Sequence, residues 1–505
     1  MESKITISSE SYRRILKSTS ILGGSAAFNI VLRLVRTKIL AILLGPSGIG
    51  LLGLYTSLKD IAVAIARMGI DNSGVRQIAE AVGTGDEEKI ACTVYGLRRC
   101  SWCLGLFGMS LFILLSSPLG RLTFETSAYT SDLIFLSVVV FLEIIMAGEI
   151  ARIQGMRKIG DLAKVYAFSA LYSTFLCIPI LFTWGQNGII LFLIATAVAG
   201  ALTAWWYARK IEGCCVQMSW MEIWANVKPL LSLGSVFMLG DWMSKGTIYL
   251  VRIFVIRWLG LEAVGFYQAS IALSSIYVAF ILDSMIKDYY PRLTALASDN
   301  KAFNELVNQQ SEVGILLSAP GILATLTFAP IILQIFYTAK FMAAFEILRW
   351  QILGVFIQVA CWPMSFILQA KGRGRLFLFT ELLKNAIHIG LMWAGIYYFA
   401  LKGAGIAFFG MYFLYCVIIY TTAKYLTGFS LSKANIKNIM LVIPAIGIVF
   451  VSDLFLEEGW YLILGSTVSV AIGLYSMKNL ASSIGLGKFE SVLVRIRKRL
   501  YDRVS

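Results

Sequence analysis

The sequence is short of charge and nearly lacks histidine. Only 14% of its 505 residues are charged, 58% are hydrophobic, and a single residue is histidine. The mean hydropathy is +0.76, whereas a soluble domain carries about 25% charged residues. Polar side chains are too few to cover a globular surface, which excludes a soluble fold and predicts an integral membrane protein.

Motifs for cofactor or metal chemistry are missing as well. The sequence has no Walker motif, no cluster of metal ligands and no arrangement typical of a catalytic triad. Eight cysteines are scattered along it, and the Cys100-x-x-Cys103 pair lies in an apolar segment, where it is typical of packing. We therefore expect no cofactor and no enzymatic activity.

Long apolar runs are what the sequence does have. A helix needs about 20 apolar residues to cross a bilayer, and the chain holds about fourteen such segments. The runs are apolar on most sides and do not alternate, so they predict helices. The predicted fold class is an all-α integral membrane protein with about fourteen transmembrane helices. Residues 71–92 and 291–312 are expected to form short surface helices.

A single offset relates the two halves of the chain. Adding 215 to a position in the first half reaches its counterpart in the second, and the matches include Leu44-Gly45 with Leu259-Gly260, Gly50 with Gly265, and Gln154 with Gln369. The predicted domains are 1–212, an N-terminal lobe of six helices; 213–430, a C-terminal lobe of six; 431–477, two appended helices; and 478–505, a basic amphipathic tail. Two like-oriented lobes are typical of transporters that alternate access.

The formal net charge of +15 is mostly explained by topology. Nearly all Lys and Arg in the connecting segments fall on the side of the termini, while the opposite side has only Arg121, Lys340 and Lys402. The positive-inside rule then predicts that both termini are cytoplasmic. The basic tail is expected to lie on the anionic inner leaflet, and no binding of nucleic acid is expected.

Charged residues at bilayer depth are the strongest candidates for function, because each costs about 3 kcal/mol to insert. Asp241, Lys245 and Arg252 share one stripe of a helix. An acid and a base four residues apart, such as Asp241 and Lys245, can also simply fix helix packing, and this alternative stays open for them.

Arg33, Arg36 and Arg252 have no acid at pairing distance in their own helix. Guanidinium groups bind phosphate oxygens two at a time and keep their charge when desolvated, so these residues predict an anionic cargo. The predicted substrate-binding residues are Arg33, Arg36, Lys38, Lys59, Asp60, Asp241, Lys245 and Arg252.

Glu381, Lys384 and His388 lie on one face of a helix in the second half. We expect a structural pair here, with a relay for Na⁺ or H⁺ coupling as the alternative. No metal site is predicted.

Several short motifs carry a family resemblance. The stretch Lys38 to Gly50, KILAILLGPSGIG, followed by the polar Ser57-Leu-Lys-Asp60, resembles the start of the O-antigen flippases, bacterial translocases of lipid-linked oligosaccharides. The stretches 263–268, 290–293 and 349–354 resemble the same family at corresponding places. Lys38 matches a basic position of the relatives. The resemblance implies the multidrug/oligosaccharidyl-lipid/polysaccharide exporter fold, in which two six-helix lobes form a V.

The resemblance also implies a function. An undecaprenyl-diphosphate-linked O-antigen or related repeat unit would be flipped from the cytoplasmic to the periplasmic leaflet of the bacterial inner membrane, by alternating access through a cationic central cavity. The expected partners are this polyprenyl-diphosphate-linked oligosaccharide, anionic membrane lipids, a polysaccharide polymerase and a chain-length regulator.

Two other functions stay open. One is a multidrug or organic-cation exporter of the same superfamily, for which an acid-lined cavity is expected. The other is a membrane glycan polymerase or ligase, against which the short outer loops argue because they leave little room for catalytic groups.

Overall fold

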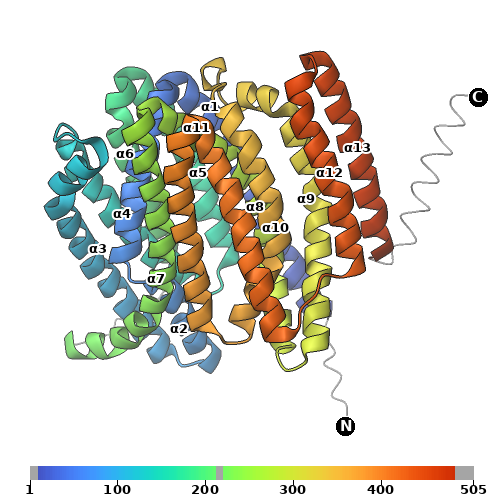
Figure 1. Ribbon diagram of the computed structural model, residues 1–505. Coiled ribbons are helices and arrows are strands. Elements are labelled where there is room, and N and C mark those ends of the chain that lie inside the picture. Colours follow the sequence, from blue (N-terminus) through green and yellow to red (C-terminus); the bar gives the residue numbers. More distant parts are fainter. Residues whose placement is uncertain (1–8, 212–219, 484–505) are drawn as a thin grey trace, which may run out of the picture. The chain divides into compact units, whose positions relative to one another are not determined.

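A computed structural model describes residues 9–211 and 220–483, and this part of the chain contains thirteen α-helices and no β-strand (Figure 1). Within the helices, the side chains of residues 9–28, 30, 220–237, 276–281, 283–288, 458 and 483 are outside the described set. Most of the predicted basic tail, from residue 484 on, also lies outside it.

The chain divides into two compact units, residues 1–265 with 336–340 and residues 266–335 with 341–505. The first unit contains α1 (Ser9–Ala66), α2 (Ile70–Thr84), α3 (Glu87–Phe124), α4 (Thr130–Gly155), α5 (Ile159–Trp184), η1 (Gly185–Gly188), α6 (Ile189–Ala208) and α7 (Trp220–Leu259). The predicted lobe and tail boundaries are not tested by this division and stay predictions.

Helices of the second unit follow. They are α8 (Leu261–Ala295), whose first residues belong to the first unit, then α9 (Asn300–Phe336), α10 (Ala344–Ala370), α11 (Gly374–Thr427), α12 (Lys433–Phe455) and α13 (Glu458–Ser483). The short helix η2 (Ala339–Phe341) lies between α9 and α10 and belongs mostly to the first unit, which includes residues 336–340. Helices α12 and α13 lie side by side (Figure 1). Arg349 of α10 is buried and holds Asp453 of α12 at 2.7 Å, which anchors this helix pair.

Nine helical segments of the described residues are long and apolar enough to cross a membrane. Three of them exceed a single crossing and contain a break: 31–66 at Gly45, 159–208 at the short helix η1, and 374–427 at Ala400. The all-α membrane fold is confirmed, while the count of fourteen crossings stays a prediction.

Backbone conformation follows the 215-residue offset. Left-handed or similarly positive φ angles occur at Gly45 and Gly260, at Gly185 and Ala400, and at Arg157 and Gly372. The last pair also ends its helices in the same way. Arg157 N–H donates to Gln154 O at 3.0 Å, and Gly372 N–H donates to Gln369 O at 3.0 Å. Equivalent positions therefore turn the chain with the same local geometry.

Two equivalent glycines meet within the first unit. A Cβ at Gly50 would lie 3.0 Å from the backbone nitrogen of Gly265, and a Cβ at Gly265 would overlap the backbone of Pro46. The start of α8 therefore packs directly on the Gly45–Gly50 turn of α1, and only glycine permits this approach.

The two predicted surface helices differ in outcome. Residues 70–84 form the separate helix α2, because positive φ angles at Met68 and Gly69 end α1. The prediction for 71–92 holds only in part, since residues 87–92 already belong to α3. The prediction for 291–312 is wrong, since these residues continue α8 to Ala295 and begin α9 at Asn300. The counterparts of Met68 and Gly69 are Asp283 and Ser284, so the second half has no glycine at which to turn.

The first unit is built around α1, which contacts α4, α5 and α7, while α2 lies against α3, α4 and α7. Ile70 and Ile78 of α2 are fully buried against Leu97 of α3 and Ala151 of α4. This packing holds α2 rigidly beside the polar segments of α1, α4 and α7 that are described next.

Candidate functional site

A cavity of about 300 Å³ lies inside the first unit, between residues of α1, α2, α4, α5 and α7. Its charged lining consists of Asp60 from α1, Arg67 directly after α1, Asp71 from α2, Glu143 from α4 and Lys245 from α7. The cavity therefore brings together Asp60 and Lys245 of the predicted site, although 185 residues separate them in the sequence.

Lys59 forms the first group of ion pairs at this cavity. Its Nζ lies 2.6 Å from Glu143 Oε1 and 3.0 Å from Asp60 Oδ1. The Lys59 side chain is only 11% exposed, so the two carboxylates replace most of the water around its ammonium group. The contact with Glu143 also joins α1 to α4.

Arg67 forms the second group. Its Nη1 lies 2.9 Å from Asp71 Oδ2, and its Nη2 lies 2.6 Å from Asp241 Oδ2. Lys245 Nζ contacts the same oxygen of Asp241 at 3.2 Å, which agrees with the packing alternative stated for this pair. One guanidinium, at the residue that directly follows α1, thus contacts both α2 and α7.

The charged side chains at this cavity are paired with one another. Four carboxylates and three cations belong to the two groups, and each cation in this described cavity contacts at least one carboxylate. A phosphate group entering here would have to displace carboxylates from their cations. The charged lining is therefore mixed and slightly acidic.

Arg33 and Arg36 have a different environment. Arg33 is exposed, and within the described residues its guanidinium makes no hydrogen bond or ion pair. Arg36 is half-buried and donates to the neutral hydroxyl of Ser173 on α5. Arg33 precedes the Gly45 break by twelve residues, about 18 Å along the helix. The two arginines are three residues apart on α1, and neither has a carboxylate contact in the described residues.

Arg252 and Lys38 donate hydrogen bonds to other parts of the chain. Arg252 of α7 is 6% exposed and donates to the carbonyl of Gly53 at 2.6 Å and to the hydroxyl of Ser57. Lys38 donates to the backbone carbonyl of Tyr337. These contacts account for both residues as packing elements, and a direct role in substrate binding stays a prediction for them.

The second unit contains the predicted coupling residues. Lys384 is paired with Glu381, and the Tyr415 hydroxyl donates to Glu381 at 2.8 Å. His388 is 9% exposed, and no hydrogen-bond partner for its Nε2 exists in the described part of the chain. The contacts of Glu381 and Lys384 agree with a structural pair, while a role in ion coupling stays a prediction.

Sequence reasoning did not assign Arg67, Asp71, Glu143 and Tyr166 to the site. Arg67 and Asp71 are four residues apart, the spacing of a helical ion pair, so this spacing was an available signal. Tyr166 gave no such signal, because its place at the cavity depends on how α5 packs against α4.

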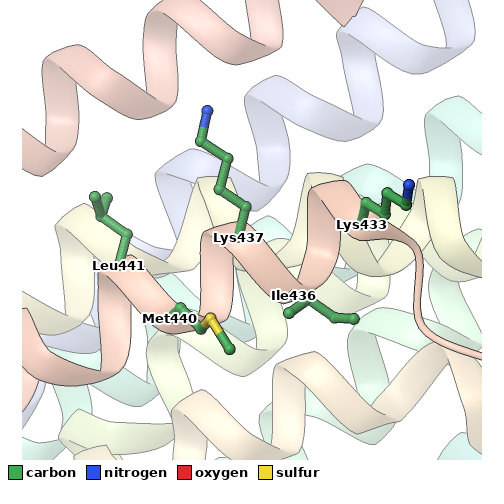
Figure 2. A pocket seen from close by; sticks show the side chains of 5 residues that line it. All are labelled: Lys433, Ile436, Lys437, Met440 and Leu441. Carbon is green, nitrogen blue, oxygen red and sulfur yellow. The ribbon is translucent and has the colours of Figure 1, made fainter.

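A shallow hollow on the surface of α12 is separate from these groups. Figure 2 shows Lys433, Ile436, Lys437, Met440 and Leu441, which line it along one helix. Two exposed lysines above apolar side chains are typical of a helix end at a membrane surface, and the hollow brings together no residues from other elements.

The family of the chain follows from a match to a known family profile. A profile of the family described as polysaccharide biosynthesis protein matches residues 39–346, which is more than half of the sequence. The chain belongs to the polysaccharide biosynthesis protein family. A comparison with curated protein sequences finds no significant match.

Solved structures similar to this polysaccharide biosynthesis protein are transporters. An inward-facing multidrug resistance MATE transporter of the MOP superfamily has a TM-score of 0.68 at 15% identity, covering 79% of this chain and 94% of that one. The lipid II flippase MurJ, in an inward closed conformation, has a TM-score of 0.62 at 13% identity, covering 93% and 99%.

A MOP superfamily transporter from Pyrococcus furiosus, described as having reversed polarity in its binding pocket, has a TM-score of 0.59 at 14% identity and covers 82% and 95%. At these identities the likeness shows the fold. This member of the polysaccharide biosynthesis protein family is thus a multi-pass membrane protein with the fold of MOP superfamily transporters.

Proposed function

We propose that this protein is a flippase that moves an undecaprenyl-diphosphate-linked polysaccharide repeat unit, such as an O-antigen unit, from the cytoplasmic to the periplasmic leaflet of the bacterial inner membrane. It is not an enzyme in this proposal. Family membership supports a place in polysaccharide biosynthesis, and the fold supports transport by alternating access.

The observation that carries the proposal is the pair of arginines on α1. Arg33 and Arg36 lie deep along a membrane span and make no carboxylate contact in the described residues. Buried or lipid-facing guanidiniums are costly unless an anion binds them, and a diphosphate supplies oxygens for both. The polyprenyl tail of such a cargo can stay in the lipid while its headgroup crosses.

The remaining parts of the proposal follow from topology. Both termini are cytoplasmic, and the headgroup crosses by alternating access through a cationic central cavity. Na⁺ or H⁺ coupling through Glu381, Lys384 and His388 belongs to this proposal, as do a polysaccharide polymerase and a chain-length regulator as partners.

A multidrug or organic-cation exporter is the second candidate. The carboxylates of the first-unit cavity favour it, because four of them accompany three cations. The similar MATE structures are described as multidrug transporters. The contacts of those four carboxylates with Lys59, Arg67 and Lys245 argue against this candidate, because within the described cavity each carboxylate already has a cation.

The test is a deletion strain complemented with variants of the full chain. Arg33→Ala and Arg36→Ala should each lower the appearance of surface polysaccharide by about tenfold or more, because each removes one charge-assisted contact to phosphate. Lipid-linked glycan should accumulate on the cytoplasmic side. Arg121→Ala, an exposed arginine at the far end of α3, is the matched control and should leave export unchanged.

Protein amounts in the membrane are compared for every variant. Normal polymer with Arg33→Ala at normal protein level would overturn the charge assignment. Loss of drug resistance in the deletion strain, with normal polysaccharide, would instead support the exporter.

A further inference from the structure

The cavity of the first unit has neutral polar groups that are not used by the fold. Asn72 of α2, Gln154 of α4 and Tyr166 of α5 all line it. The two amide side chains are exposed, and the Tyr166 side chain is 45% exposed. Within the described part of the chain, none of these three side chains makes a hydrogen bond. Amides and a phenol are therefore the groups at this cavity that are available to a ligand.

The charged groups at the same cavity are occupied. Lys59 contacts two carboxylates, Arg67 contacts two, and Lys245 contacts Asp241. A diphosphate would meet carboxylates here, with repulsion of several kcal/mol for each close like-charge pair. This cavity is therefore unsuited to the anionic part of the proposed cargo, which fits Arg33 and Arg36 instead.

A sugar ring matches the groups that are available. Its hydroxyls both donate and accept hydrogen bonds, as amide side chains do. Its C–H face can pack on an exposed aromatic ring that keeps a polar tip, as Tyr166 does. The paired ions add fixed acceptors at the wall, including Oδ1 of Asp71, which is buried and has no hydrogen-bond partner in the described residues.

We propose that this cavity is a glycan subsite, in which Tyr166, Asn72 and Gln154 bind a sugar of the lipid-linked cargo while Arg33 and Arg36 bind its diphosphate. The inference rests on the proposed function and divides its substrate between two places of the first unit. In this proposal the ion pairs of Lys59 and Arg67 hold α1, α2, α4 and α7 in fixed positions around the sugar.

Binding measurements on the purified full chain in nanodiscs test the division. The two probes are undecaprenyl diphosphate and the same lipid carrying one N-acetylglucosamine. Wild type should bind the sugar-bearing lipid more tightly. Tyr166→Ala should weaken that binding by about tenfold and leave the bare lipid unchanged, since it removes one ring-to-sugar contact. Arg36→Gln should weaken both probes.

Two further variants control for folding and for the aromatic ring. Tyr172→Ala removes a half-exposed tyrosine of the same helix that does not line the cavity, and it should leave both affinities unchanged. Tyr166→Phe keeps the ring and loses only the hydroxyl, so it should retain most of the preference for the sugar-bearing lipid. Unchanged elution on size exclusion shows that each variant folds.

Each other result has a definite meaning. Equal binding of both lipids by wild type, or an equal effect of Tyr166→Ala on both, overturns the glycan subsite and leaves the proposed function standing. Displacement of the sugar-bearing lipid by tetraphenylphosphonium, dependent on Tyr166, overturns it in favour of a cation site. Binding of neither lipid by wild type overturns the proposed function itself.

Discussion

The first copy of the repeat holds charged side chains where the second holds neutral ones. Lys59, Asp60 and Glu143 correspond, at the 215-residue offset, to Ser274, Ser275 and Gln358. In the same way, Arg33 and Arg36 correspond to Ile248 and Val251. Lys59, Asp60, Glu143 and the two arginines are therefore features of the first copy, whereas Asp241 and Lys245 of the second ionic group lie on α7 in the second copy, where they correspond to Ala26 and Ile30 of the first.

The turns of the two copies are shared. Gly45 and Gly260 both have positive φ, and the helix ends at Arg157 and Gly372 make the same backbone hydrogen bonds. Because the second copy makes these turns without the ions, the backbone does not require them. The turns therefore serve the fold, and the ion pairs of Lys59 and Arg67 are not needed to form them.

The largest effect is expected from disrupting the packing of α8 on the turn at Gly45. Gly265→Ala places a Cβ on the backbone of Pro46 and should destabilise the protein by about 3 kcal/mol, because backbone atoms cannot move aside as a flexible side chain can. Thermal unfolding in mild detergent, followed by fluorescence-detected size exclusion, measures this. Gly447→Ala on α12, where a Cβ meets nothing within 4 Å, is the control. Equal unfolding temperatures for the two variants would contradict the packing argument.

A smaller loss of stability is expected from removing a charge of the first copy, and it can be compared with a substitution at the equivalent neutral position of the second copy. Lys59→Ala leaves Asp60 and Glu143 facing each other and should cost about 2 kcal/mol, less than for a fully buried pair because Glu143 is 26% exposed. Ser274→Ala at the equivalent position removes a buried hydroxyl that donates to Ile271 O at 3.1 Å, and it should cost only about 1 kcal/mol. The same unfolding assay compares them, and the double variant Lys59→Met with Glu143→Gln should recover part of the loss. Equal shifts for Lys59→Ala and Ser274→Ala would show that the ions add no more to the fold than the hydroxyl of Ser274 does.

The smallest effect is expected at the equivalent helix ends where one copy has Arg157 and the other has Gly372. Gly372→Ala should destabilise by about 1 kcal/mol, since φ is +67° there and a Cβ is disfavoured at such angles. Arg157→Gly, at φ +55°, should leave stability unchanged or raise it by less than about 1 kcal/mol. Denaturant or thermal melts of both variants check the signs. A destabilised Arg157→Gly protein would mean that the Arg157 side chain supports the turn through its own contacts.

Several elements were readable in advance because one local rule decides each of them. The apolar runs are long enough to require helices, and the offset that links Gly45 to Gly260 appears again in the backbone angles. The α2 segment was expected as a surface helix. Residues 291–312 were not predicted correctly. The sequence signal that α8 continues is the lack of a glycine at Ser284, the counterpart of Gly69, and the lack of one glycine is a weak signal.

The site was predictable only in part. The depth of Arg33, Lys59 and Lys245 follows from their positions along apolar runs. Their environments do not, because Arg33 is without a carboxylate contact in the described residues while Lys59 has two. Sequence distance hides these partners, as Arg67 and Asp241 are 174 residues apart.

The sequence by itself determined that this protein is a helical membrane protein, that its turn residues recur at an offset of 215, and that charges lie within its apolar segments, because hydrophobic length, helical period and turn glycines are local properties. Only the tertiary structure decided which charges neutralise one another. An ion pair depends on how neighbouring helices pack and rotate, and helical period shows only which residues share a face. In the described residues Lys59 and Lys245 contact carboxylates whereas Arg33 and Arg36 do not, and the packing of α5 puts Tyr166 beside the cavity.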